Sequence, residues 1–241
     1  MIKMQNKKIL IVKNFSLETP GLIGEVLNEN NLDYEIINLD EGKDFPNPNN
    51  YSAIFVLGGP DSANDRTPKM TEEIKRIRQA IAAGVPYFGI CLGMQALVKA
   101  SGGEVYKNRI KEIGLKGPLG NFFEISLTDA GRKDKLFDGI ESPMKIFQLH
   151  GETVSLSPVS QLLATGEYCT NQAVKIGKSS YGFQGHLELN DTLFGKLIAE
   201  DLDLRRISPS SLRADYNTLK SEYQDNGRII LNNFLKIASL V

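Results

Sequence analysis

Up to about residue 100, short apolar runs alternate with helical patterns, and this alternation limits the fold more than any other feature of the sequence. Four apolar runs have the length of buried strands: 8–13, 34–39, 53–57 and 85–90. Helical patterns lie between them, at 20–28 and in a segment that Thr71 is expected to cap and Gly84 to end. Strands that alternate with helices predict an α/β fold, in which helices surround a mostly parallel central sheet.

After Gly103 the apolar runs become shorter, and turn residues separate them. The candidate strands are 122–127, 144–149, 161–165, 173–176 and 180–184. They predict an antiparallel or mixed extension of the same sheet, and 107–121 is expected to be a glycine-rich loop.

The end of the sequence is helical in pattern, at 192–202 and again at 211–238. No linker or repeat divides the chain, so we expect one domain over 1–241, with a core at about 8–200 and a helical tail at 201–241. Apolar residues at helical spacing predict that the tail packs on the body or on a second copy, so a homodimer is one of the expected assemblies.

Composition and charge exclude several classes of protein. The 241 residues carry a formal net charge of −1, whereas a dedicated nucleic-acid binder usually has a basic excess. The apolar run at 9–12 is too short for a signal peptide or a membrane span. The two cysteines, Cys91 and Cys169, do not suffice for a disulfide framework and favour a reducing compartment. We therefore expect a cytoplasmic protein that binds neither nucleic acid nor membrane.

A Gly-Ile-Cys-Leu-Gly segment at 89–93 lies between an apolar run and a helix-prone segment. A nucleophile on a sharp strand-to-helix turn needs small residues two positions before and after it, because neighbouring backbone crowds any Cβ there. Gly89 and Gly93 have this spacing around Cys91. The helix N-terminus would also favour the reactive thiolate. The alternative is a buried strand that ends in a glycine-rich turn, with Cys91 as a small core residue.

A cysteine nucleophile usually needs a base within hydrogen-bond reach and a group that orients this base. The chain has two histidines, and each precedes a glutamate by two positions: His150 with Glu152, and His186 with Glu188. In an extended segment residues i and i+2 share a face, so either glutamate could support its histidine. The context favours His186, which lies at a strand-to-helix junction where α/β sites gather. His150 is expected to line a pocket or to orient a loop, and a hydrogen-bonded structural imidazole is the alternative for His186.

Three motifs together resemble the class I glutamine amidotransferases, whose triad is Cys-His-Glu. They are Gly58-Gly59-Pro60, Gly-Ile-Cys-Leu-Gly-Met-Gln at 89–95 and Gly-Phe-Gln-Gly-His-Leu-Glu at 182–188. The segments 148–152 and 162–165 resemble the stand-alone branch that is similar to the glutaminase domain of GMP synthase. The resemblance covers roughly residues 8–200 in the right order. It implies a flavodoxin-like fold with helices on both faces of the sheet, and no cofactor.

The resemblance also implies a role for each residue of the motifs. Cys91 is expected to be the nucleophile, His186 its base and Glu188 the group that orients the imidazole. The backbone N–H groups of Gly59 and Leu92 are expected to form the oxyanion hole.

Three further residues are expected to contact substrate. By similarity Gln95 binds the substrate amino acid, and His150 and Glu152 line the pocket for its α-amino and carboxylate groups. No metal site is expected, since the histidines and cysteines are scattered in the sequence, and Cys169 is interpreted as structural or incidental.

The expected activity is a cysteine hydrolase that releases glutamate and ammonia from glutamine. Many family members have Phe where Gly185 stands and Pro where Leu187 stands, and the Gln-Gly-His form resembles γ-glutamyl peptidases of the same superfamily. A γ-glutamyl peptidase and a non-catalytic partner-binding module are therefore the alternatives. Room for a leaving group near Gly185 and 107–121 is expected to separate the first two activities. About 50 residues follow Glu188, so the acceptor half of an amidotransferase is expected either to be absent or to lie on another chain, as a separate synthetase subunit.

Overall fold

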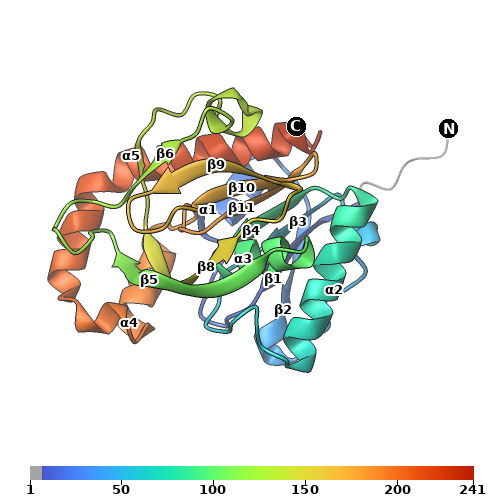
Figure 1. Cartoon of the computed structure of the whole chain (residues 1–241), viewed down its shortest axis with the longest axis horizontal. Coiled ribbons are helices and arrows are strands. Elements are labelled where there is room, and N and C mark those ends of the chain that lie inside the picture. The colour runs from blue at the N-terminus through green and yellow to red at the C-terminus, as the bar shows by residue number, and fades with distance from the viewer. Residues whose placement is uncertain (1–6) are drawn as a thin grey trace.

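The computed structural model describes residues 7–241, and its centre is a nine-stranded sheet (Figure 1). The strands of this sheet are β1 (Ile9–Lys13), β2 (Tyr34–Asn38), β3 (Ala53–Val56), β4 (Tyr87–Ile90), β6 (Glu124–Leu127), β7 (Met144–Lys145), β9 (Ser160–Gly166), β10 (Ala173–Ile176) and β11 (Ser180–Phe183). Their order is β2-β1-β3-β4-β11-β10-β9-β6-β7. The first five strands in this order are parallel, and each later pair is antiparallel. The predicted α/β fold with a mixed extension is confirmed.

The pairing of β4 with β11 is the feature that builds the site. Gly89 lies opposite Gly182, and Ile90 lies opposite Phe183. Because the two strands are parallel neighbours, their carboxyl ends meet at one edge of the sheet, where α/β proteins place their ligands. Segments more than 90 positions apart in the sequence, with Cys91 on one and His186 on the other, are thus brought side by side.

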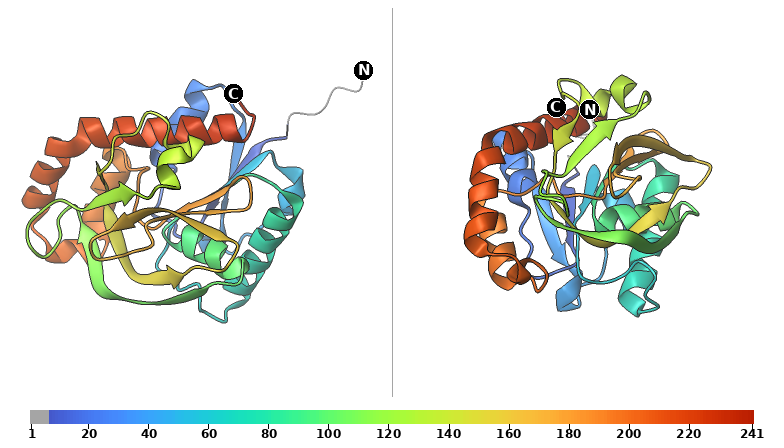
Figure 2. Two further views of the ribbon diagram at one scale, coloured as in Figure 1. Left: turned by 45° about the horizontal axis from the view of Figure 1, so that its top comes forward. Right: turned by 60° about the vertical axis from the view of Figure 1, so that its left-hand side comes forward.

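Helices cover both faces of the sheet, as Figure 2 shows with α5 on one side and α2 and α3 on the other. The helices are α1 (Gly21–Glu29), α2 (Pro68–Ala83), α3 (Leu92–Ala100), α4 (Asp191–Glu200) and α5 (Pro209–Ile237). Short 3₁₀ turns are Leu39–Glu41, Pro48–Asn50, Gly131–Lys133, Lys135–Phe137 and Leu204–Arg206. Apolar side chains of α1 and α5 pack on one face, and those of α2 and α3 pack on the other.

The start of α2 differs from the prediction. Its cap is Thr67, whose hydroxyl accepts a hydrogen bond from the backbone N–H of Met70, and Pro68 occupies the first turn. The helix therefore begins about one turn before Thr71, the threonine that was expected to cap it. Thr71 lies inside the helix. Gly84 ends the helix with a φ of +69°, as expected.

A second, two-stranded sheet replaces part of the expected loop at 107–121. It consists of β5 (Glu104–Gly114) and β8 (Gln148–Ser155), which pair antiparallel with a register shift between Lys107 and Glu112. Many side chains of β5 are exposed and charged, so the sequence lacks the apolar alternation of a half-buried strand. The predicted strand at 144–149 is wrong as a single element, because it belongs partly to β7 and partly to β8.

The C-terminal helices pack on the body of the molecule. The first half of α5 packs against α4, where the rings of Phe194 and Tyr216 stack with centroids 4.0 Å apart. The second half, with Phe234 at its centre, joins the core beneath the sheet. Within residues 7–241, no helix combines the length and apolar character that a membrane crossing requires.

Candidate active site

Cys91 occupies a strained turn between β4 and α3. Its φ is +51° and its ψ is −105°, a conformation that non-glycine residues rarely adopt and that is typical of functional sites. A Cβ on Gly89 would lie 2.5 Å from the carbonyl group of Gly93, and a Cβ on Gly93 would lie 2.2 Å from the carbonyl oxygen of Val56. Both glycines are therefore required by close backbone approach, as the spacing around the cysteine predicted.

His186 and Glu188 follow β11 and form a buried pair. The Nδ1 atom of His186 lies 2.7 Å from Oε1 of Glu188, whose other oxygen accepts the N–H of Leu187 at 2.9 Å. Burial lowers the pKa of the imidazole, but the charge of Glu188, the nearby thiol of Cys91 and the hydrogen bond with Glu188 outweigh it and hold this pKa well above its usual value. Among residues 7–241, no group forms a hydrogen bond with the Nε2 atom of His186. The imidazole is thus oriented on one side and free on the side of the thiol.

Cys91 and His186 line one cavity of about 460 Å³ at the carboxyl edge of the parallel strands. The thiol lies 3.8 Å from the carbonyl oxygen of Leu149, and Nε2 of Gln184 approaches the sulfur at the same distance. The volume falls within the range of pockets that hold small organic ligands. The sequence-predicted nucleophile and base therefore share a ligand-sized space.

The loop after β3 closes one side of this cavity. A Cβ on Gly58 would lie 3.3 Å from Cε1 of His186 and 3.4 Å from Cβ of Cys91, and a Cβ on Gly59 would lie 3.3 Å from the side chain of Leu92. Within the described part of the chain, the backbone N–H groups of Gly59 and Leu92 are not among those that donate to a backbone carbonyl outside helices and strands. Gly59 lines the same cavity as Cys91, and free N–H groups at such a position are suited to stabilising an oxyanion.

The remaining predicted contact residues also line the cavity. Gln95 is buried and donates to the carbonyl oxygen of Glu152 at 3.2 Å and to Oε1 of Gln184 at 3.3 Å. The carboxylate of Glu152 accepts a hydrogen bond from the hydroxyl of Ser62 at 2.7 Å. His150 lies on β8 in the cavity wall, where sequence context placed it.

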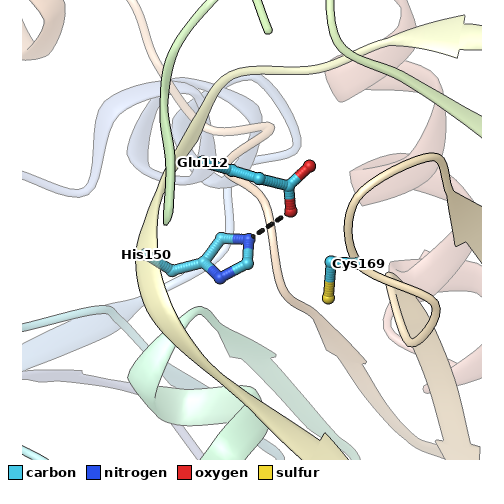
Figure 3. A group of neighbouring side chains, drawn as sticks. All are labelled: Glu112, His150 and Cys169. Carbon is cyan, nitrogen blue, oxygen red and sulfur yellow. Dashed lines mark ion pairs between the residues drawn. The ribbon is translucent and has the colours of Figure 1, made fainter. Parts of the chain in front are cut away.

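His150 is held from both sides. Its Nδ1 atom lies 2.9 Å from the carbonyl oxygen of Glu152, and its Nε2 atom lies 2.8 Å from Oε2 of Glu112 on β5 (Figure 3). Gln172 also donates to this carboxylate, at 3.1 Å. Glu152 thus supports His150 through its backbone carbonyl group, whereas the side chain of Glu152 bonds Ser62. His150 fixes β8 to β5 and so shapes the cavity wall.

The structure brings Cys169 close to His150 and Glu112, although the three residues are scattered along the sequence. Possible ligand atoms of Glu112, His150 and Cys169 all lie within 4.8 Å of one another, and all three residues are buried. Their atoms already contact protein groups, including the hydroxyl of Thr153 at 3.1 Å from the sulfur of Cys169. Burial raises the pKa of the Cys169 thiol to about 11. The contacts of these three residues link β5, β8 and the segment that carries Cys169.

Gly185 does not mark room for a leaving group. A Cβ on it would lie 2.8 Å from both Ile146 and Gln148, and the residue does not line the cavity. The space is filled from β8 and the segment before it. Of the expected loop, Lys111 does reach the cavity wall.

Sequence reasoning missed Glu18, which lies in the loop after β1 and lines the cavity. It is only 5% exposed, and its Oε1 lies 2.9 Å from the place that a Cβ on Gly58 would occupy. Burial raises the pKa of this carboxyl to about 7. The sequence did contain a signal for Glu18. It lies in the loop after the predicted first strand, and ligand sites of α/β proteins form at the carboxyl ends of the strands.

The helical tail supports the histidine segment directly. The hydroxyl of Tyr223 on α5 donates to the carbonyl oxygen of His186 at 2.9 Å and accepts the N–H of Leu189 at 3.3 Å. A Cβ on Gly227, one turn further along, would lie 2.4 Å from the carbonyl oxygen of Leu187. The tail therefore holds the backbone that presents the imidazole.

Comparisons with known proteins agree with this geometry. The glutamine-hydrolysing GMP synthase of Clostridium kluyveri is 30% identical over 193 residues, which are 79% of this chain and 35% of that protein. A γ-glutamyl-L-1-hydroxyisopropylamide hydrolase of a Pseudomonas species is 30% identical over 143 residues, 58% of this chain and 48% of that protein. The chain thus spans less than half the length of either relative. A crystal structure described as a glutamine amidotransferase from Methylobacillus flagellatus has the same fold, with a TM-score of 0.84 and 24% identity over 96% of this chain and 95% of that one.

The sequence profile of the class-I glutamine amidotransferases matches residues 16–203, which include the cysteine turn, the cavity loop and the histidine–glutamate pair. The chain belongs to the class-I glutamine amidotransferase family.

Proposed function

We propose that this protein is a glutaminase, which hydrolyses the side-chain amide of glutamine through a glutamyl thioester on Cys91. The observation that carries the proposal is the free Nε2 edge of His186, facing the same cavity as a cysteine in a strained turn. A raised pKa of His186 suits a histidine that keeps the proton of the thiol.

The reaction proceeds in two halves. The sulfur of Cys91 attacks the δ-carbonyl carbon, and His186 gives its proton to the nitrogen as the C–N bond breaks, which releases ammonia. A water molecule then gives a proton to His186 and attacks the thioester, and glutamate leaves as the C–S bond breaks. Glu188 keeps Nδ1 of the imidazole in place and stabilises its charged form.

Negative charge develops on the carbonyl oxygen in both halves of the reaction. The N–H groups of Gly59 and Leu92 are proposed to stabilise it, and loss of one such donor typically costs about 10²–10³ in rate. Gln95 and Glu152 are proposed to hold the amino-acid end of the substrate and His150 to shape this part of the cavity, since all three residues line it.

A second candidate activity is the hydrolysis of larger γ-glutamyl amides. A cavity of about 460 Å³ leaves room beyond glutamine, and one relative is named as the hydrolase of a γ-glutamyl hydroxyisopropylamide. The other relative is named as a GMP synthase, so transfer of the ammonia to an acceptor on a separate synthetase subunit is proposed as the role of the glutaminase. A non-catalytic binding module remains as the outcome in which no substrate is cleaved.

The test is the release of glutamate from glutamine, from glutathione and from a γ-glutamyl alkylamide by the wild-type protein and by Cys91→Ala. We expect release that the variant abolishes, with a thioester trapped by hydroxylamine. Equal rates in both proteins, or none in either, would reject the proposal. Faster cleavage of glutathione than of glutamine would instead favour the γ-glutamyl peptidase activity.

A further inference from the structure

Glu18 is a buried carboxylate that the proposed mechanism does not use. It belongs to the loop between β1 and α1, is 5% exposed and lines the catalytic cavity. Among residues 7–241, the side-chain hydrogen bonds and the ion pairs do not involve its carboxylate, and neither of its oxygens is a fully enclosed atom without a partner. The carboxylate therefore faces the cavity, where a donor on a ligand can reach it.

The geometry places this carboxylate at the imidazole end of the cavity. A Cβ on Gly58 would lie 2.9 Å from Oε1 of Glu18, 3.3 Å from Cε1 of His186 and 3.4 Å from Cβ of Cys91. The three side chains therefore converge on one glycine. In the proposed reaction the departing nitrogen must reach Nε2 of the same imidazole to receive its proton, so it comes to the region that Glu18 faces.

We propose that Glu18 forms the leaving-group site, where its carboxylate accepts an N–H hydrogen bond from the departing nitrogen and so favours amides over esters as substrates. This inference rests on the proposed function. His186 supplies the proton that the nitrogen takes up when the C–N bond breaks, and Glu18 accepts a hydrogen bond from another hydrogen of that nitrogen without changing its own protonation. An ester oxygen carries no such hydrogen, and its alcohol gains nothing from the carboxylate.

The preference for amides over esters should depend on pH. Burial raises the pKa of Glu18 to about 7, with further influence from His186, Glu188 and Lys13, which are the charged groups that act on it. The carboxylate, which accepts the bond, dominates above this pH, and the protonated acid dominates below it. The preference for amides should therefore rise as the pH increases through about 7. Glu18→Gln keeps His186 and removes the titration of Glu18, so the difference between the pH profiles of wild type and variant reports Glu18.

The test compares two substrates that differ in one atom pair: γ-glutamyl methylamide and glutamate γ-methyl ester, with glutamine as a second amide. The measured quantity is kcat/KM, which reports formation of the thioester. We expect Glu18→Gln to lower kcat/KM on both amides by about 10- to 100-fold, and on the ester by less than about threefold. The amide-to-ester ratio of the variant should lack the rise through about pH 7 that the wild type shows.

Glu73→Gln is the matched control. Glu73 is also a buried carboxylate, its pKa is raised to about 7 by burial, and it accepts a hydrogen bond from Asn14 at 2.8 Å outside the cavity. Its amide-to-ester ratio should equal that of the wild type. If wild-type protein cleaves glutamine but not the methylamide, glutamine serves as the amide in every ratio.

Each contrary result has a distinct meaning. An equal loss on amide and ester in Glu18→Gln would mean that Glu18 acts through His186, and it would overturn the leaving-group assignment. No loss on either substrate would also overturn this assignment. In both cases, activity of the wild-type protein on glutamine would leave the glutaminase proposal standing. Activity of the variant on the ester shows that it has folded. Failure of wild-type protein on all three substrates would reject the proposed function itself.

Discussion

The two histidines share the spacing to a following glutamate but have different partners. His186 is paired on one nitrogen with the carboxylate of Glu188, and its other nitrogen faces the cavity of Cys91. His150 is engaged on both nitrogens, by the carbonyl oxygen of Glu152 and by the carboxylate of Glu112. A proton acceptor needs a free nitrogen, so the geometry suits His186 to catalysis and His150 to holding the wall.

The difference arises from partners that are distant in sequence. Glu112 reaches His150 because β5 and β8 pair, and Cys91 reaches His186 because β4 and β11 pair. The tripeptide alone therefore does not determine the role of its histidine. Topology determines it, through the strand that lies alongside.

The largest expected effect distinguishes the two histidines by the loss of kcat on substitution. His186→Asn should lower kcat for glutamate release by about 10⁴-fold or more, since it removes the base. His150→Asn should lower kcat by less than about tenfold, because it affects only the wall. Measured rates in the reverse order would assign the base to His150.

The two glutamates offer the next test, because each follows its histidine by two positions. Glu188→Gln keeps the shape of the side chain but loses the charge that holds the imidazole, and we expect kcat to fall by about 10²–10⁴-fold. Glu152→Gln is the matched variant, and it should raise KM with little change in kcat. A fall in kcat for Glu152→Gln as large as that for Glu188→Gln would remove the distinction.

The buried pair of His150 and Glu112 should matter more for stability than for rate. Their side chains are 1% and 2% exposed, and removing one partner leaves the other unpaired. Glu112→Gln should lower the free energy of unfolding by about 2–4 kcal/mol, as measured by urea denaturation, and kcat at saturating glutamine should fall by less than about tenfold. Unchanged stability would mean that the pair does not hold β5 to β8.

The smallest expected effect is at Tyr223. Tyr223→Phe removes the hydroxyl that donates to the carbonyl oxygen of His186, and we expect kcat to fall by about two- to fivefold. Tyr51→Phe is the control, because the Tyr51 hydroxyl bonds Glu35 far from the cavity. A larger loss in the control than at Tyr223 would contradict support of the site by α5.

Sequence reasoning reached the parts of the molecule whose causes are local. The strands before Cys91, the glycines around it and the helix after it follow from spacing and backbone crowding, and the structure confirms this architecture. The fold class and the family are confirmed as well. The triad and oxyanion-hole roles remain predictions, although Gly59, Cys91 and His186 line one cavity.

The rest depends on contacts that no window of sequence contains. β5 was expected to be a loop because its exposed charges conceal its pairing with β8. Glu18 was overlooked because it carries no motif, and only the approach of Gly58 and His186 gives it a place in the cavity. The cluster around Cys169 formed from residues that are scattered along the chain.

The contact between Tyr223 and the histidine segment has a consequence for how the protein comes into being. During translation, the strands and turns up to residue 190 leave the ribosome before α5 does. The imidazole cannot take its final support until residues 223–227 have emerged and docked. The backbone that presents the imidazole is therefore completed after the strands around it, because its support comes from a later part of the chain.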